Sequence, residues 1–536
     1  MEEKHQHHLD KPNKTNQQDP QTLGCIVVDP TNGCSVSEGR NTRAVGYSSH
    51  AEGTNNNSYG IYSHTEGEFT STGGISRDGT AGEAAHAEGS STEANGFTSH
   101  AEGYATKAMG VASHTEGAVT NVYGDYSHAE GYQTIAGGGY GAHSEGNGTR
   151  AMETSSHAEG YLSRALGPNS HAEGHDTEAR VDDSHAEGYQ TIAGGGYGAH
   201  SEGNGTQAMG TSSHAEGYQS VAFGPNSHAE GKASNANNEA SHAEGQSEAT
   251  GAFSHAEGGS TATGSTAHSE GTDTTASGIG SHAEGYQTVA SGDFSHAEGF
   301  FSDTNYQFAS HIMGRWGIAT APYSWFLANG SPAERTPVIS LLGTGNGCFT
   351  GKVTAMSFEI GGCGAADFAE MFETVDGEPI EVGYFVTLDK NKIRIAKEDD
   401  DYILGITSAN PAFITDSGGM TWKNKFLKDE WGRIQYHNVT TPPIKDKEGN
   451  IIFPEDTQIK PMLNPEYDPT RDYVPRCNRP EWIPVGIIGK LRIRDDGSCQ
   501  VNGYCKPNDE GIATASNVGY RILERTGPNQ ILVLFK

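Results

Sequence analysis

Basic residues, cysteines and long apolar runs are all scarce in this 536-residue sequence. It contains 35 Lys and Arg but 68 Asp and Glu, which gives a formal charge of −33 with His neutral. This charge disfavours binding to nucleic acid or to an anionic membrane surface. The seven cysteines show neither a disulfide framework nor a metal-ligand spacing. No apolar run is long enough to span a membrane, so we predict no membrane insertion.

The first residues also lack a recognisable targeting signal. Met1 to His8 contain no apolar core of the kind that a signal peptide needs, so we expect assembly in the cytoplasm. Residues 1–22 are rich in Lys, His, Asn, Gln and Asp, which predicts a flexible N-terminal tail. The segment Cys25–Asp29 is typical of a single strand that docks this tail on the following region.

The most abundant feature of the sequence is one repeated five-residue motif. Ser281-His282-Ala283-Glu284-Gly285 recurs with small variations from His50 to His296, mostly every 14 residues. A unit of this length is too short for a helix pair and is typical of a β-solenoid, with Gly at the corners and Ala, Ser and Thr facing inward. We therefore predict a β-roll over residues 23–299. One coil this thin encloses almost no core, so several chains are expected to associate.

This 14-residue unit resembles the head repeats of YadA-like trimeric adhesins over about residues 34–300. The resemblance implies an all-β fold in which a left-handed β-roll solenoid forms a parallel homotrimer. The sequence departs from that family where it places His and Glu two residues apart, at positions that usually hold aliphatic residues. Residues i and i+2 of a strand share a face, so each type should form a column along the roll. Examples are His282 with Glu284 and His296 with Glu298.

The His and Glu columns allow three interpretations. Our prediction is that they are paired and partly buried, because His and Glu neutralise each other if His is protonated. A solvated polar face is the second interpretation. Metal binding by stacked histidines is the third, but a pattern repeated in every coil favours a structural role. We therefore predict no metal and no other cofactor.

Aromatic residues arrive in number after Phe300, where we expect the roll to be capped. Residues 300–355 are predicted to form this cap and a β region that joins the three chains. Within it, Val338–Leu342 and Phe349–Val353 flank a Gly-Asn-Gly turn and are typical of a hairpin. An exposed solenoid end offers unpaired edges, which explains why a cap is needed.

Residues 356–536 are predicted to form a compact domain of mostly short strands. The clearest strands are Ile483–Ile493 and Ile531–Phe535. Only Asp367–Glu373 is predicted as a short helix. In that interpretation Asp367 is the N-cap and Glu370 is its capping-box partner.

The segment Gly361–Met371 also carries a second resemblance. Together with Gly383–Asp389, Tyr402–Ile406 and Asn508–Thr514 it is similar to the intramolecular-chaperone autoproteolytic domain, the peptidase G-two family, of phage neck-appendage proteins. The resemblance covers nearly all of residues 356–536.

This resemblance implies self-cleavage of the Ala366–Asp367 bond by acidic residues. Glu370 would be the general base or acid, and Asp367 would polarise or position the bond. The family often has Ser before the scissile bond, whereas this chain has Ala366.

Four other side chains are weaker candidates for this chemistry. Asp389, Asp495 and Asp496 could complete an acid–base pair, although each is more typical of a turn. Cys363 lies between glycines without a basic partner that would activate it as a nucleophile.

We therefore predict a trimeric structural protein of a fibre or appendage, on a phage virion or on a bacterial or spore surface. Its C-terminal domain would act as an intramolecular chaperone and cleave itself off. The alternative is an uncleaved trimeric adhesin, with a host receptor or glycan as partner and the C-terminal domain as a permanent trimerisation clamp.

Overall fold

The computed structural model describes residues 25–73, 81–351, 353, 367–417, 425–445, 449, 451–453, 455–468, 470 and 474–536. The predicted tail (1–22), Cys363 and Ala366 lie outside these residues. The chain divides into two compact units, residues 1–349 and 350–536. Across the described residues the regular structure is all β apart from one 3₁₀ turn, η1 (Arg476–Asn478), and no helix there is long and apolar enough to cross a membrane.

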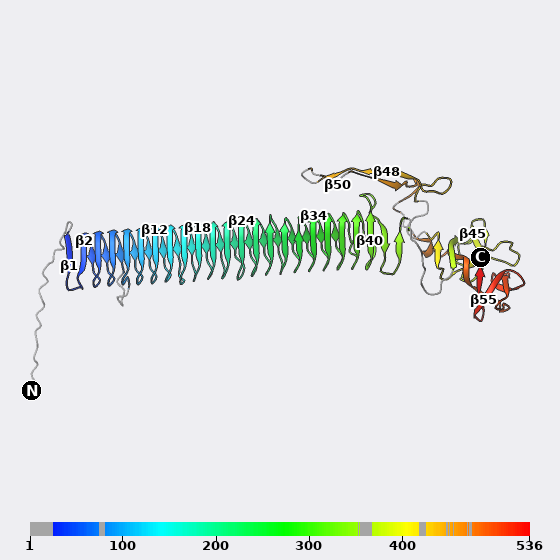
Figure 1. Cartoon of the computed structure of the whole chain (residues 1–536), viewed down its shortest axis with the longest axis horizontal. Helices are drawn as coiled ribbons and strands as arrows, with labels where there is room; N and C mark the ends of the chain where they lie inside the picture. The colour runs from blue at the N-terminus through cyan, green and yellow to red at the C-terminus, as the bar shows by residue number, and fades with distance from the viewer. Residues whose placement is uncertain are drawn as a thin grey trace, which may run out of the picture. The chain divides into compact units, whose positions relative to one another are not determined.

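The first unit is a parallel β-solenoid whose coils follow the 14-residue repeat (Figure 1). Each coil contributes one longer strand that begins at the repeat histidine and one two-residue strand, from β3 (Arg43–Ala44) to β37 (Val289–Ala290). Each repeat histidine pairs with the histidine of the next coil, as His282 does with His296. The longer strands are β4 (His50–Thr54), β6 (His64–Glu68), β8 (His86–Ser90), β10 (His100–Tyr104), β12 (His114–Ala118), β14 (His128–Tyr132), β16 (His143–Asn147), β18 (His157–Tyr161), β20 (His171–His175), β22 (His185–Tyr189), β24 (His200–Asn204), β26 (His214–Tyr218), β28 (His228–Gly231), β30 (His242–Gly245), β32 (His255–Glu257), β34 (His268–Thr272), β36 (His282–Tyr286) and β38 (His296–Phe300).

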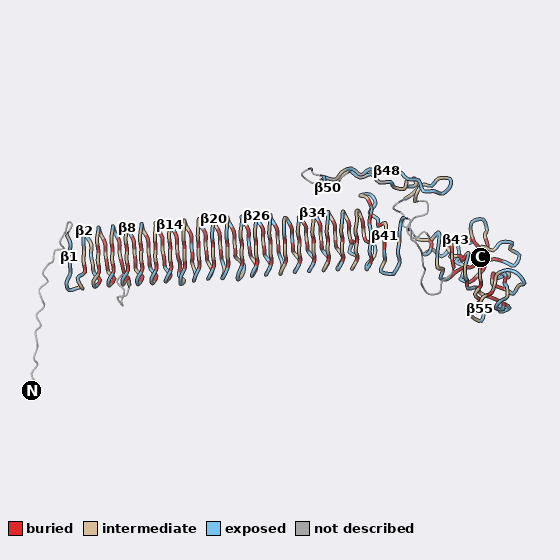
Figure 2. The backbone as a smooth tube through the Cα atoms, in the orientation of Figure 1, coloured by how far each residue is buried: buried red, intermediate tan, exposed pale blue. Residues whose placement is uncertain are grey.

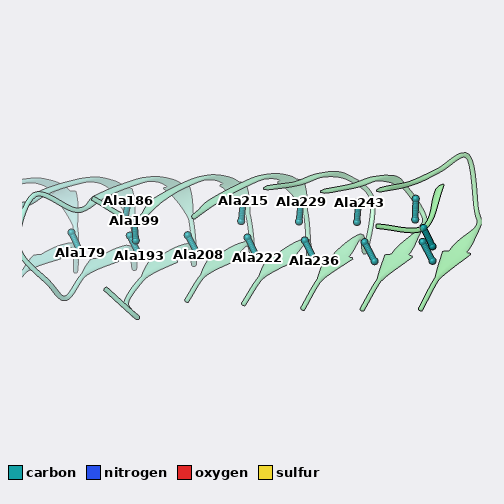
Figure 3. Packing of buried hydrophobic residues seen from close by; sticks show 14 of the residues in the cluster. Ala179, Ala186, Ala193, Ala199, Ala208, Ala215, Ala222, Ala229, Ala236 and Ala243 are labelled. Carbon is teal, nitrogen blue, oxygen red and sulfur yellow. The ribbon is translucent and has the colours of Figure 1, made fainter. Parts of the chain in front are cut away.

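The interior of the solenoid is built from small side chains. In one coil Ser281, Ala283, Thr288 and Ala290 are all buried, and the same positions are buried in coil after coil (Figure 2). Two rows of alanines, one from each strand series, face each other across this interior (Figure 3). The prediction that Ala, Ser and Thr face inward is confirmed.

The glycine after each repeat glutamate has a specific structural reason. Gly285 has a φ of +107°, and a Cβ atom there would lie 2.2 Å from the carbonyl oxygen of Gly299 in the next coil. Only a residue without a side chain allows the two backbones to approach this closely.

Both ends of the solenoid carry antiparallel strands. At the start, β1 (Cys25–Asp29) pairs with β2 (Ser35–Arg40), as predicted. At the other end the parallel coils continue past residue 299 through β39 (His311–Arg315) and β40 (Trp325–Asn329). They are followed by a hairpin, as predicted, formed by β41 (Pro337–Leu341) and β42 (Gly347–Phe349). Its second strand begins within the predicted turn and ends at Phe349, where the predicted strand Phe349–Val353 was expected to begin.

The second unit is organised around one long strand, β52 (Trp482–Arg494), which contains the predicted strand Ile483–Ile493. It pairs with three strands: β43 (Asp367–Glu373), β46 (Gly405–Thr407) and β56 (Gln530–Phe535). The other strands of this sheet are β44 (Phe385–Asp389), β45 (Lys392–Ile395), β47 (Phe413–Thr415), β53 (Tyr504–Pro507), β54 (Ala513–Ser516) and β55 (Tyr520–Gly527). Two small separate sheets pair β48 (Tyr436–Thr441) with β51 (Asp456–Pro461), and β49 (Ile444–Lys445) with β50 (Ile451–Phe453).

The helix predicted at Asp367–Glu373 is wrong, because this segment forms strand β43. Its burial alternates, with Asp367, Ala369 and Met371 on the buried face. This period of two matches the pairing with β52 and overrides the local capping-box pattern. Asp367 is therefore not a helix N-cap.

Candidate functional site

Asp367 is the described half of the predicted cleavage site. It is the first residue of β43, lies opposite Gly489 of β52, and is only 6% exposed. The Ala412 amide donates a 2.9 Å hydrogen bond to the Asp367 carbonyl oxygen. The peptide that begins at this residue is thus held on two sides, by β52 and by the segment before β47.

The carboxyl group of Asp367 is buried without full compensation. Its Oδ2 atom is buried and has no hydrogen-bond partner. Burial raises the pKa of Asp367, and the Ser408 hydroxyl and the Ala412 amide lower it only in part. A carboxyl with a raised pKa keeps its proton at a higher pH than a free aspartate, so Asp367 can act as a proton donor.

Gly486 makes room for this carboxyl. A Cβ atom at Gly486 would lie 2.9 Å from Asp367 Oδ2. Ser408, which is also buried, follows β46 and donates its amide to the carbonyl oxygen of Pro484 on β52. Neither Gly486 nor Ser408 could be predicted from the sequence as a neighbour of this carboxyl, because both lie far from Asp367 in the chain.

Asp367 lines a cavity of about 1190 Å³ within this unit. Val382, Tyr384 and Thr407 also line it. The charged side chains in its wall, in addition to Asp367, are Lys490, Arg492, Arg494, Asp495 and Glu510. The buried Asp367 carboxyl therefore lies beside a cavity whose wall carries both basic and acidic side chains.

Glu370 lies on the other face of β43. Strand alternation places it with Phe368 and Phe372 rather than with Asp367, and its side chain is half-buried. In the register of the sheet it lies between Val485 and Thr415. The two predicted catalytic residues, Asp367 and Glu370, therefore lie on opposite faces of β43, and a single copy of the strand does not bring their carboxyl groups together.

The three weaker carboxylate candidates have structural roles or lie in the open. Asp495 is buried and forms a two-pronged ion pair with Arg525, with Nη2–Oδ2 at 2.9 Å and Nη1–Oδ1 at 3.1 Å. Asp496 accepts a 2.9 Å hydrogen bond from the Ser498 amide, as in a turn. Asp389 is exposed at the end of β44.

The His and Glu columns lie on the outer face of the solenoid and are about one-third exposed. His282 Nε2 lies 3.8 Å from Glu284 Oε2, and His296 Nε2 lies 3.9 Å from Glu298 Oε2. Burial, followed by the neighbouring histidines, lowers the pKa of His282, and it lowers the pKa of His296 to about 4. These two rings are therefore neutral at pH 7, so they cannot neutralise the carboxylates by protonation.

Two phage appendage proteins match about a third of this chain. The preneck appendage protein of Bacillus phage PZA is 37% identical over 178 residues, which is 33% of this chain and 19% of the relative. The pre-neck appendage protein of Bacillus phage phi29 is 37% identical over 164 residues, 31% of this chain and 18% of the relative. The chain thus spans about a fifth of the length of these curated relatives.

A solved structure and two family models match as well. The crystal structure of the bacteriophage phi29 gene product 12 C-terminal fragment is 33% identical, and the match covers 32% of this chain and 100% of that chain with a TM-score of 0.27. Residues 201–227 and 269–295 match the YadA head domain repeat, and residues 339–529 match the Peptidase_G2, IMC autoproteolytic cleavage domain. The chain therefore combines repeats that match the YadA head domain with a C-terminal region that matches the IMC autoproteolytic cleavage domain.

Proposed function

We propose that this chain is a subunit of a trimeric fibre or appendage of a phage virion, and that its C-terminal domain is an intramolecular chaperone that cleaves itself off at Ala366–Asp367. The relatives support the appendage assignment, and the YadA head repeats support a trimer. The single observation that carries the cleavage proposal is the buried carboxyl of Asp367, at the first residue of β43 within a matching autoproteolytic domain.

The proposed reaction is hydrolysis of one peptide bond. The oxygen of water adds to the Ala366 carbonyl carbon, the bond to the Asp367 nitrogen breaks, and that nitrogen takes up a proton. Asp367 supplies or directs this proton, because its own carboxyl lies next to the leaving nitrogen and its pKa is raised.

We propose Glu370 as the base that activates the attacking water, provided that its side chain can reach the Ala366–Asp367 bond. Three residues of extended strand span about 10 Å, which is beyond the reach of a glutamate side chain along its own strand. Glu370 therefore acts on the bond either before β43 is fully extended or from another copy in the trimer. Both routes couple cleavage to the state of assembly.

Denaturing electrophoresis and intact mass of the purified chain test the proposal. Cleavage yields two fragments, residues 1–366 and 367–536, and the second begins with Asp367. Asp367→Asn and Glu370→Gln should each slow the cleavage by about 10²–10⁴-fold. Asp389→Asn removes an exposed carboxylate of the same domain and should cleave at the normal rate.

One full-length band in the unaltered protein would overturn the cleavage proposal. It would favour the alternative, an uncleaved adhesin that binds a host receptor or glycan and keeps its C-terminal domain as a permanent clamp. Cleavage at a different bond would leave the chaperone function standing but remove Asp367 from the reaction.

A further inference from the structure

The most regular chemical feature of the solenoid is the pair of columns formed by the repeat histidines and glutamates. We propose that these columns bind zinc or a similar divalent transition-metal ion. Each ion would be held by two histidines of successive coils and the glutamate between them. The proposal does not depend on self-cleavage or on the phage assignment. It revises the expectation from sequence that the columns are structural and bind no metal.

The histidines form an almost continuous stack. From His50 to His296 the rings of successive coils have centroid distances of 4.6–5.1 Å and are close to parallel. This spacing follows from the parallel pairing of the strands, which puts each repeat histidine directly opposite the next. The glutamates lie in a second column on the same face, two residues further along each strand.

The ligand atoms are already grouped in threes. In each group, one nitrogen from each of two histidines and one carboxylate oxygen lie within 4.8 Å of one another. Five such groups are His64–Glu66–His86, His86–Glu88–His100, His100–Glu102–His114, His200–Glu202–His214 and His228–Glu230–His242. Two imidazoles and a carboxylate are a common ligand set for zinc.

The distances within these groups fit a bound ion after small side-chain rotations. Zn–N and Zn–O bonds of about 2.0–2.2 Å place two tetrahedral ligand atoms about 3.3 Å apart. The His Nε2 to Glu Oε2 distance is 3.4 Å in the coil of His228 and 3.9 Å in that of His296. The ligand atoms of each group lie within 4.8 Å of one another, so the side chains must come closer together to hold an ion.

The histidine nitrogens that face the carboxylates lack other partners. The Nε2 atoms from His64 to His296 are buried and form no hydrogen bond. A buried polar atom without a partner is unfavourable, and a row of them is unusual in a stable fold. A cation gives each of these nitrogens a partner and also reduces the repulsion between stacked carboxylates.

Sharing of histidines sets the stoichiometry. His86 belongs to the group above it and to the group below it, and its Nε2 can bind only one ion at a time. Neighbouring groups therefore exclude each other, and binding saturates at one ion for every two coils. Mixed nitrogen and oxygen ligands favour zinc, nickel, copper or cobalt over magnesium and calcium, which prefer oxygen.

The test is equilibrium dialysis of the full chain against ZnCl₂, with zinc counted by mass spectrometry. His5, His7 and His8 of the N-terminal tail could bind zinc themselves, so they are first replaced by Asn. We expect one zinc per two coils, a higher unfolding temperature of the solenoid with zinc, and no comparable binding of MgCl₂. Cobalt chloride should give a visible absorption band typical of nitrogen and oxygen ligands.

Two matched variants locate the ions. The column variant changes four successive carboxylates, Glu202→Gln, Glu216→Gln, Glu230→Gln and Glu244→Gln, and should bind about two fewer ions per chain. The control changes four exposed carboxylates off the column, Glu153→Gln, Asp183→Asn, Glu239→Gln and Glu248→Gln, and should bind the full number. Circular dichroism checks that both variants are folded. The proposal is overturned if the tail-substituted chain binds no zinc, or if the column variant binds as much zinc as the control.

Discussion

Single glycines decide whether the coils can stack. Gly285 combines a positive φ with a backbone contact that leaves no room for a methyl group. We expect Gly285→Ala to destabilise the solenoid by about 2–4 kcal/mol, through left-handed backbone strain and the clash with the Gly299 carbonyl. Thermal unfolding followed by circular dichroism measures this loss.

Gly138 is the matched control for that change. A Cβ atom there meets no other atom within 4 Å, and its φ is not in the left-handed region. Gly138→Ala should therefore change stability by less than about 0.5 kcal/mol. Equal effects at the two positions would show that glycine content, rather than contact between coils, determines stability.

The residues around the proposed cleavage site show which parts of the site can be predicted from the sequence alone. A local sequence pattern and a resemblance point to Asp367 and Glu370, but the same local pattern predicts a helix where the structure has strand β43. Ser408 and Gly486 surround the Asp367 carboxyl only because β46 and β52 pair in the folded sheet. Contacts set by such long-range pairing leave no local signal in a single sequence.

The repeating coil was the most predictable element. A fixed period, glycine corners and small inward residues define it without any tertiary information. The end of the solenoid was harder to place, because Ile312 and Phe326 replace the usual small inward residue in β39 and β40. The aromatic residues that predicted a cap after Phe300 therefore partly belong to further coils.

The histidine column should make the solenoid sensitive to acid. Burial and then the neighbouring histidines lower the pKa of His128, His185 and His214, and the pKa of His296 falls to about 4. A lowered folded-state pKa means that the unfolded chain binds more protons below the ordinary value of 6.5, so stability falls as the pH drops from about 6.5 toward 4. Unfolding temperatures measured in zinc-free buffer between pH 7.5 and 4.5 should show this decrease.

Substitution within the column separates this effect from general acid denaturation. His128→Asn, His185→Asn and His214→Asn remove three of these groups while keeping polar side chains on the same face. The triple variant should lose less stability than the unaltered chain over the same pH interval. An unchanged pH dependence would mean that the acid sensitivity comes from other groups.

At the scale of the whole molecule, the repeats that make the solenoid predictable also make its assembly ambiguous. Successive coils are nearly identical, so copies shifted by one coil present almost the same surface to each other. The narrow alanine interior contributes little hydrophobic stabilisation per residue, which is why association of three copies is expected. A separate domain that trimerises first would select one of the many possible registers of the three solenoids. Its removal after assembly would make the trimer kinetically persistent.

Removal of the C-terminal unit before assembly should therefore impair the formation of a uniform trimer. We expect a shortened chain of residues 1–349 to give mixed oligomers and aggregates in sedimentation velocity, because nothing fixes the register of its coils. The full chain with Asp367→Asn, which keeps the domain attached, should instead form a single trimeric species, and so should the unaltered chain after cleavage. The shortened chain tests chaperoning and the Asp367→Asn chain tests cleavage, so the two properties are measured separately. A uniform trimer of residues 1–349 obtained without the domain, or a well-folded monomer of the full chain, would contradict the proposed chaperone role.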